Sequence, residues 1–195
     1  MKFASVLAVT AVGLLGFGSA FAQGARSDGS FTPPNPSRPV PGVEGGGSCP
    51  NPPLIGSLPF NQAGNTCGGA NTVNSYGGCP NLAFPYPGPE DVYAITYGAS
   101  QSLDITADLA GSTGDLAIFV LATCGSGDSC FTTSQDAIGP GIGPEVVPTI
   151  SGRPAGTFYV YIDSYYAASN PAGCGSYTLN VAGTLPVELE SFQID

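Results

Sequence analysis

Histidine and tryptophan are absent from this sequence, and lysine occurs only at position 2. Without histidine, serine–histidine and cysteine–histidine catalytic arrangements are excluded, and the imidazole ligand common in zinc sites is missing. The single lysine lies in a segment that we expect to be removed, which excludes a serine–lysine pair as well. The lack of tryptophan counts against a sugar-binding platform, because the large indole face suits stacking on sugar rings.

Positive charge is also scarce. Four residues are lysine or arginine, 14 are aspartate or glutamate, and the formal net charge at pH 7 is −10. Such a chain repels nucleic-acid phosphates and anionic lipid surfaces, so we expect neither as a partner. It attracts cations, including Ca²⁺, which prefers oxygen ligands. The low share of charged residues and the abundant glycine and proline favour β-structure with many turns over helices.

Long apolar runs are missing except at the N-terminus. Lys2 is followed by the apolar run Phe3–Phe17, and Ala20 and Ala22 then form a small-x-small cleavage pattern. This order is typical of a secretory signal peptide and is too short for a membrane anchor. We therefore predict a signal peptide over residues 1–22, export to the periplasm or the extracellular space, and no membrane insertion after cleavage.

The next segment is rich in proline and glycine. Residues 23–48 show almost no apolar periodicity, so they cannot bury enough surface to offset the entropy of ordering. Within them, Pro33–Pro41 should form an extended polyproline-like chain. We interpret residues 23–48 as a disordered arm, 49–183 as one folded domain and 184–195 as a C-terminal tail.

The cysteine pattern predicts disulfide bonds. An even number of cysteines follows the predicted cleavage site, which in an exported chain favours disulfides over metal binding, and no C-x-x-C pair supports a zinc site. Cys124 and Cys130 flank the turn sequence GSGDS, and we predict a bond between them. The other four allow three connectivities, of which we favour the short Cys67–Cys79 loop. The six are Cys49, Cys67, Cys79, Cys124, Cys130 and Cys174.

Short strands separated by turns follow from about Cys49 onward. Residues 103–109 and 176–181 alternate apolar and polar side chains, and residues 92–97 and 116–121 are apolar on both faces, as in central strands covered twice. In residues 158–163, the side with Phe158, Val160 and Ile162 belongs in a core. With no helix of useful length, the pattern predicts an all-β fold, an antiparallel β-sandwich stabilised by disulfides.

An ordered set of motifs runs through this region. It consists of Asp-x-Tyr at Asp91 and Tyr93, Gly-Asp-Leu at 114–116, Ala-Gly-Thr-Phe-Tyr at 155–159 and Gly-Ser-Tyr-Thr-Leu at 175–179. In this order the motifs resemble the bacterial pre-peptidase C-terminal domain, here as a secreted protein without a peptidase. The resemblance implies a jelly-roll-like β-sandwich. It also implies an accessory module of the kind that in some members binds insoluble polymers or Ca²⁺.

Four carboxylates at or near predicted strand ends are candidate Ca²⁺ ligands, because loops there can bring oxygen atoms together. The alternative, which we favour, is that such residues hydrogen-bond the local backbone. No EF-hand spacing is present, and we expect no resident cofactor beyond this structural Ca²⁺. The four are Glu90, Asp91, Asp115 and Asp163.

Tyrosines cluster in and after the strand at 158–163. Their flat apolar faces and hydroxyl groups suit stacking on sugar rings or contact with extended protein chains. The alternative, which we favour for Tyr159 and Tyr161, is that neighbouring strands or residues 49–79 cover them, since exposed apolar strips are uncommon. The candidate binding residues are Tyr159, Tyr161, Asp163, Tyr165 and Tyr166.

These observations predict a secreted, non-catalytic β-sandwich that acts in binding or adhesion at the cell exterior, on a polysaccharide or an extended protein. An alternative is a filament or matrix subunit that self-associates by strand pairing through the arm or through LPVELESF at 185–192. A second alternative, which we do not favour, is a hydrolase that uses a pair of carboxylates.

Overall fold

In a computed structural model of the protein, the described residues are 46–80, 82, 84–99, 101–134 and 143–184. The predicted signal peptide, nearly all of the predicted arm and residues 185–195 of the predicted tail lie outside them. Within this part of the chain there are nine strands, one short 3-10 helix and no α-helix. The elements are β1 (Leu54–Ile55), β2 (Phe60–Asn65), β3 (Glu90–Tyr97), β4 (Ser102–Asp108), β5 (Leu116–Leu121), η1 (Gly127–Ser129), β6 (Cys130–Thr133), β7 (Pro144–Ser151), β8 (Gly156–Ser164) and β9 (Ser176–Gly183).

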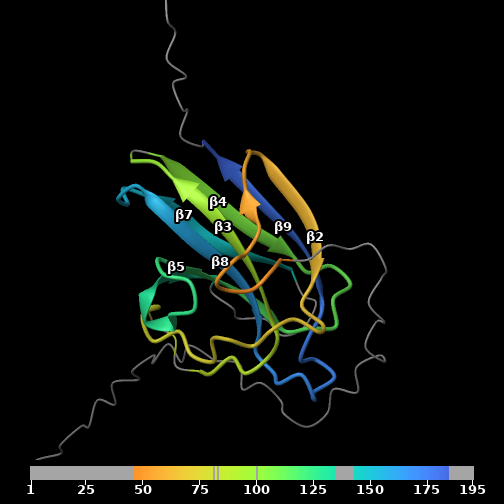
Figure 1. The fold of residues 1–195 in the computed structure, drawn as a ribbon. Coiled ribbons are helices and arrows are strands. Elements are labelled where there is room, and N and C mark those ends of the chain that lie inside the picture. The colour runs from red at the N-terminus through yellow and green to blue at the C-terminus, as the bar shows by residue number, and fades with distance from the viewer. Residues whose placement is uncertain (1–45, 81, 83, 100, 135–142, 185–195) are drawn as a thin grey trace, which may run out of the picture.

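The strands form two sheets that pack face to face, so the predicted β-sandwich is confirmed (Figure 1). The first sheet has the order β1-β3-β8-β5-β6 and the second has the order β2-β9-β4-β7. The chain changes sheet at every connection except the one from β5 to β6, which is the crossing pattern of a jelly-roll-like sandwich. One pairing departs from the antiparallel expectation, because the two-residue β1 runs parallel to β3.

A core of aliphatic and aromatic side chains fills the space between the sheets. The predicted core residues Phe158, Val160 and Ile162 lie there, opposite Leu179 and Val181 of β9. Period-two alternation produces this core, since every second residue of β4 and β9 points inward while its polar neighbours face solvent. The strands that we predicted at 92–97, 103–109, 116–121, 158–163 and 176–181 are all present.

The outer face of the first sheet carries a second apolar cluster. On this face Phe119 and Tyr161 are fully buried, because the chain between β2 and β3 lies over them. We call this connection, residues 66–89, the cover segment; it is yellow in Figure 1 and runs on the side of the molecule away from β4 and β9. Tyr76 of the cover segment stacks on Phe119 with 3.7 Å between ring centroids. The first sheet is thus buried on both faces, as its doubly apolar strands require.

The disulfide pairing differs from both pairs that we predicted. The bonds are Cys49–Cys124, Cys67–Cys174 and Cys79–Cys130, so the predicted Cys124–Cys130 and Cys67–Cys79 pairs are wrong. The observed bonds connect the cover segment and the chain before it to the sandwich.

Strand register explains the correction. Cys130 lies opposite Leu121 in the β5–β6 ladder, which fixes it in the outer-face cluster beside Cys79, whereas Cys124 lies in the loop beyond β5. The β2–β9 ladder ends at the pair Asn65 and Ser176, and two residues further along each strand the same register places Cys67 opposite Cys174. Their Cα atoms are 4.9 Å apart, within the range of a disulfide.

We predict that replacing Cys67 and Cys174 together by serine lowers the free energy of unfolding by about 2–5 kcal/mol, because the bond closes a long loop. Urea unfolding without reductant measures the change. Peptide mapping of the unreduced protein supplies the control and should recover Cys49 linked to Cys124. An unchanged unfolding midpoint, or recovery of a Cys124–Cys130 peptide, would contradict the described connectivity.

Candidate binding surface

The predicted site residues separate into a buried group and a partly exposed group. Tyr161 and all four candidate calcium ligands are buried. Tyr159, Tyr165 and Tyr166 are each partly exposed. The tyrosine side of β8 is therefore not one open strip, and the two groups have different surroundings.

Tyr161 is covered at both its ring and its hydroxyl. Its ring meets Tyr76 edge to face, and its hydroxyl accepts the N–H of Gly125 at 2.8 Å. The same hydroxyl lies 2.9 Å from Sγ of Cys49, which is bonded to Cys124 above β5. The prediction of Tyr161 as an exposed binding residue is wrong, because the cover segment and this disulfide close over it; the alternative that we favoured is confirmed for Tyr161.

Asp163 and Glu90 are buried carboxyls that hold the cover segment. They lie opposite each other in the β3–β8 ladder. Asp163 accepts the hydroxyl of Tyr76 at 2.5 Å and the N–H of Ser164 at 2.6 Å. Asp163 is therefore a structural residue rather than part of an exposed binding strip.

Glu90 makes the corresponding contacts near the middle of the cover segment. Its carboxylate accepts the backbone N–H groups of Thr72 and Val73 at 3.0 and 3.2 Å, and also the Thr72 hydroxyl. The Glu90 and Asp163 carboxyls thus hold the cover segment to β3 and β8 through four polar groups of that segment. The spacing of residues in the sequence did not indicate these partners.

Asp91 points the other way, into the space between the sheets. The hydroxyl of Tyr177 donates to its carboxylate at 2.6 Å, and the backbone N–H groups of Gly46 and Asn65 also bond to it. Tyr93 lies 2.9 Å from the Tyr177 hydroxyl and completes the cluster. Asp91 therefore joins the first described residue of the chain to β2, β3 and β9.

Burial dominates the electrostatics of these groups. It raises the pKa of Asp91 to about 6, against the lowering effect of its hydrogen-bond donors. Desolvation also raises the pKa of Glu90 and of Asp163 above their ordinary values, and it raises the pKa of Tyr161 to about 12. Arg153, the one lysine or arginine among the described residues, lies over the Phe131 ring rather than beside these carboxyls.

We predict that Asp91 makes the protein more stable in acid than at neutral pH. Its folded pKa of about 6 exceeds the ordinary 3.8, so its stabilising effect is complete below pH 3.8 and is lost as the pH rises through 6. This group alone should make the free energy of unfolding about 2 kcal/mol higher at about pH 4.5 than at about pH 7.5.

The variant Asp91→Asn removes this titration while its amide oxygen can still accept from Tyr177. Denaturant unfolding at both pH values should show the difference reduced by that amount. The control Asp104→Asn, which removes an exposed carboxylate from β4, should leave the difference as it is. Equal pH dependence in the Asp91→Asn variant and the unchanged protein would contradict the prediction.

The four candidate calcium ligands do not converge. Among the described residues, no three histidine, cysteine, aspartate or glutamate side chains gather in a way that could hold a metal ion. Asp163 and Glu90 are adjacent, but Asp91 faces the other side of the sheet. Asp115 is buried at the start of β5, where its backbone bonds to Ala172 and Tyr165.

We therefore expect the thermal midpoint of unfolding to agree within about 1 °C in millimolar Ca²⁺ and in chelator, since an ion that binds the folded state must raise it. Calorimetric scans in the two buffers measure this, and scans in Mg²⁺ control for ionic strength. A higher midpoint in Ca²⁺ alone would show that calcium binds after all.

Three aromatic rings form a row at the surface, one from the cover segment and two from the chain just after β8. Phe84 is 54% exposed, and its ring meets Tyr165 edge to face with 6.2 Å between centroids. Tyr165 meets Tyr166 in the same way at 4.9 Å, and buried Tyr86 supports Tyr165 from below at 5.5 Å. We call Phe84, Tyr165 and Tyr166 the aromatic surface.

Phe84 was missed in the sequence because strand patterns do not reach it. It lies in a proline-containing part of the cover segment, where no alternation marks a face. The signal in the sequence is an aromatic residue followed directly by a proline, Pro85, in a stretch without strand alternation. Tyr159, by contrast, packs against the outer-face cluster of the first sheet and is not part of the aromatic surface.

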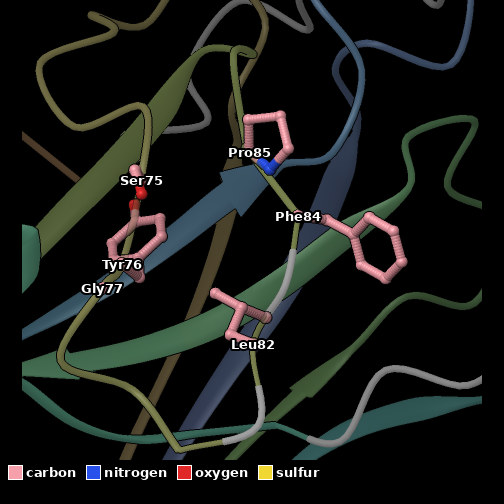
Figure 2. Close-up of a pocket in the computed structure, with 6 residues that line it drawn as sticks. All are labelled: Ser75, Tyr76, Gly77, Leu82, Phe84 and Pro85. Atoms are coloured by element: carbon pink, nitrogen blue, oxygen red, sulfur yellow. The ribbon is translucent and has the colours of Figure 1, made fainter.

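A shallow hollow borders the aromatic surface. It has a volume of about 210 Å³ and lies between residues 75–77 and 82–85 (Figure 2). In Figure 2 the Leu82 side chain points toward Gly77, whereas the Phe84 ring points away from Leu82 and Tyr76. Asp128 lies close to Gly77, because a Cβ on Gly77 would lie 2.9 Å from the Asp128 carboxylate. The residues that line it are Ser75, Tyr76, Gly77, Leu82, Phe84 and Pro85.

Comparison with solved structures finds a likeness to the pre-peptidase C-terminal domain of a collagenase from Bacillus anthracis. The match covers 66% of this chain and 92% of that chain, with a TM-score of 0.43 and 16% sequence identity. This is the type of domain that the sequence motifs resemble, and at this identity the likeness says nothing of a ligand or an activity.

No family model matches the sequence, and no curated protein matches it. In the described part of the chain, none of the helical structure is long and apolar enough to cross a membrane.

Proposed function

We propose that this protein is a non-catalytic binding module that works outside the cytoplasm and holds an extended polymer, a polysaccharide or a protein chain, on its aromatic surface. The observation that carries the proposal is the row of Phe84, which is exposed, and Tyr165 and Tyr166, which are partly exposed, on a sandwich that buries most of its other described aromatic rings. Aromatic rings at a surface offer apolar contact area to a ligand.

The support beneath the aromatic surface suits binding rather than turnover. Tyr165 rests on Tyr86, and Tyr86 in turn meets Phe119 of β5 edge to face at 4.7 Å. Rings held in this way lose little conformational entropy when a ligand binds. A rigid surface of a few residues suits a module that holds its ligand without converting it.

Chemistry by a pair of carboxylates finds little support at this surface. No residue that lines the hollow is an aspartate or a glutamate, and only Asp128 is shown close to one of the lining residues, Gly77. The carboxyls of Glu90, Asp91 and Asp163 are occupied with holding the cover segment and the start of the described chain.

Export fits the cysteine chemistry. All six cysteines form disulfide bonds, which persist in oxidising compartments and are uncommon in the cytosol. Together with the sequence features of residues 1–22, this supports a place of action in the periplasm or beyond the cell.

Retention on insoluble polysaccharides and fibrous proteins tests the proposal. We predict that the protein is retained on at least one such polymer and that Phe84→Ser weakens retention about tenfold, because loss of a central aromatic contact costs more than 1 kcal/mol. The matched control is Leu54→Ser, which removes a 62% exposed apolar side chain from β1, away from the aromatic surface. It should bind like the unchanged protein.

Two results would count against the proposal. Folded protein that no polymer retains would remove the binding function, and equal weakening by Phe84→Ser and Leu54→Ser would show nonspecific apolar adsorption. Because Phe84 is largely exposed, its replacement is expected to leave the fold intact, which the thermal midpoint checks.

A further inference from the structure

The outer face of the second sheet carries short polar side chains. This face is turned away from the cover segment (Figure 1), and alternation along β9 directs Ser176, Thr178 and Asn180 to it. Strand β9 is paired on both sides, to β2 and to β4, so a ligand on this face meets side chains rather than an open strand edge. None of the four strands of this sheet contains lysine or arginine.

A second hollow, with a volume of about 200 Å³, lies at one end of this face. Thr178 pairs with Ala63 on one side and with Asp108 on the other. Ser176 pairs with Asn65 one row further along the strands. Side chains paired in this way stand about 5 Å apart on one face of a sheet. Because serine and threonine are short, β9 forms a low floor between the longer side chains of its two neighbours.

Local hydrogen bonds hold the two longer polar side chains of the second hollow. Oδ1 of Asp108 accepts the backbone N–H of Ala110 at 2.9 Å, and Oδ1 of Asn65 accepts the backbone N–H of Cys67 at 2.8 Å. Each bond uses a single oxygen, so the other carboxylate oxygen of Asp108 can accept from a ligand and the amide nitrogen of Asn65 can donate to one. The two hydroxyl groups of the floor can do both. The second hollow thus offers donors and acceptors whose positions are set before a ligand binds.

These groups match the hydroxyl groups of a neutral sugar. A carboxylate with no cation on the surrounding strands repels phosphate, sulfate and uronate groups. An apolar ligand would leave the polar side chains of the hollow unpaired. A metal ion finds no set of ligands, since no three potential ligands gather in the described part of the chain. Because hydrogen bonds hold such a sugar, the site needs no indole ring for stacking.

We propose that the second hollow binds one neutral hexose residue of a polysaccharide, with Asp108 and Asn65 bonded to its hydroxyl groups and its C–H groups against the Ala63 methyl. The volume is below the roughly 300–1,000 Å³ of sites for drug-sized ligands, which suits a single sugar ring. A ligand of that size binds with a dissociation constant of about 1 mM. The site belongs to the other sheet and does not rest on the proposed function of the aromatic surface.

Nuclear magnetic resonance titration of the oxidised, ¹⁵N-labelled protein with neutral trisaccharides of glucose, mannose and galactose tests the proposal. At least one of them should shift the amide signals of the hollow, while the acidic trisaccharide of galacturonic acid should not. The replacement Asp108→Asn should weaken binding about tenfold, because the site loses a charged hydrogen-bond acceptor. The matched control Asp104→Asn, which changes a carboxylate on the same face of the same strand outside the hollow, should bind like the unchanged protein. The signals to follow are those of Asn65, Asp108, Ser176 and Thr178.

A second pair of variants tests occupancy of the same space. Ala63→Leu places a larger side chain in the hollow and should abolish the shifts, whereas Asn61→Leu, on the same face of the same strand but outside the lining residues, should keep them. No shift with any neutral trisaccharide, or equal weakening by Asp108→Asn and Asp104→Asn, would overturn the proposal. Shifts that appear only at the aromatic surface and are lost in Phe84→Ser would also overturn it, while supporting the proposed function. Shifts at the second hollow that Phe84→Ser leaves unchanged support the proposal whether or not the aromatic surface binds a polymer.

Discussion

The arrangement of this protein depends on the burial of its first sheet on both faces. Strands β3, β5 and β8 carry apolar side chains on both faces of the sheet. The second sheet can cover only one of these faces, so the other needs a separate cover to exclude water. The cover segment buries the other half with Tyr76, Tyr86 and neighbouring side chains. Because that segment contains little regular structure of its own, disulfides and buried carboxyls fix its position, and this fixes Phe84 beside Tyr165.

The strands could be predicted where local pattern decides them. Alternation in β4 and β9 and doubly apolar runs in β3 and β5 gave the sandwich, and the Phe158 side of β8 was placed correctly in the core. β2 and β7 were not predicted, since glycine and asparagine in β2 and two prolines in β7 interrupt any alternation.

The site was harder to predict because its features depend on contacts distant in sequence. Tyr161 and Tyr165 look alike in the sequence, and only the path of the cover segment buries one fully and leaves the other partly exposed. The disulfides depend in the same way on strand register, which sequence spacing does not contain. We favoured a structural role for the carboxylates, with hydrogen bonds to the local backbone. The carboxylates are hydrogen-bonded, but their partners include tyrosine hydroxyls that are distant in the sequence.

The acidic residues of this chain also have a role inside the molecule. Buried carboxyls without a neighbouring cation are stable only when hydrogen-bonded or protonated, and here hydroxyl and backbone donors surround them. They connect the chain before β3 to both sheets. The position of the aromatic surface is a consequence of the packing beneath it, where Tyr86 contacts both Tyr165 and Phe119.

Hydroxyl-radical footprinting of the folded protein, read by mass spectrometry, tests most directly whether the cover segment closes the outer face of the first sheet. The account predicts oxidation at Phe84, Tyr165 and Tyr166, with Tyr76 and Tyr161 protected until the protein is unfolded. Oxidation of Tyr161 at the rate of Tyr165 in the folded protein would contradict it.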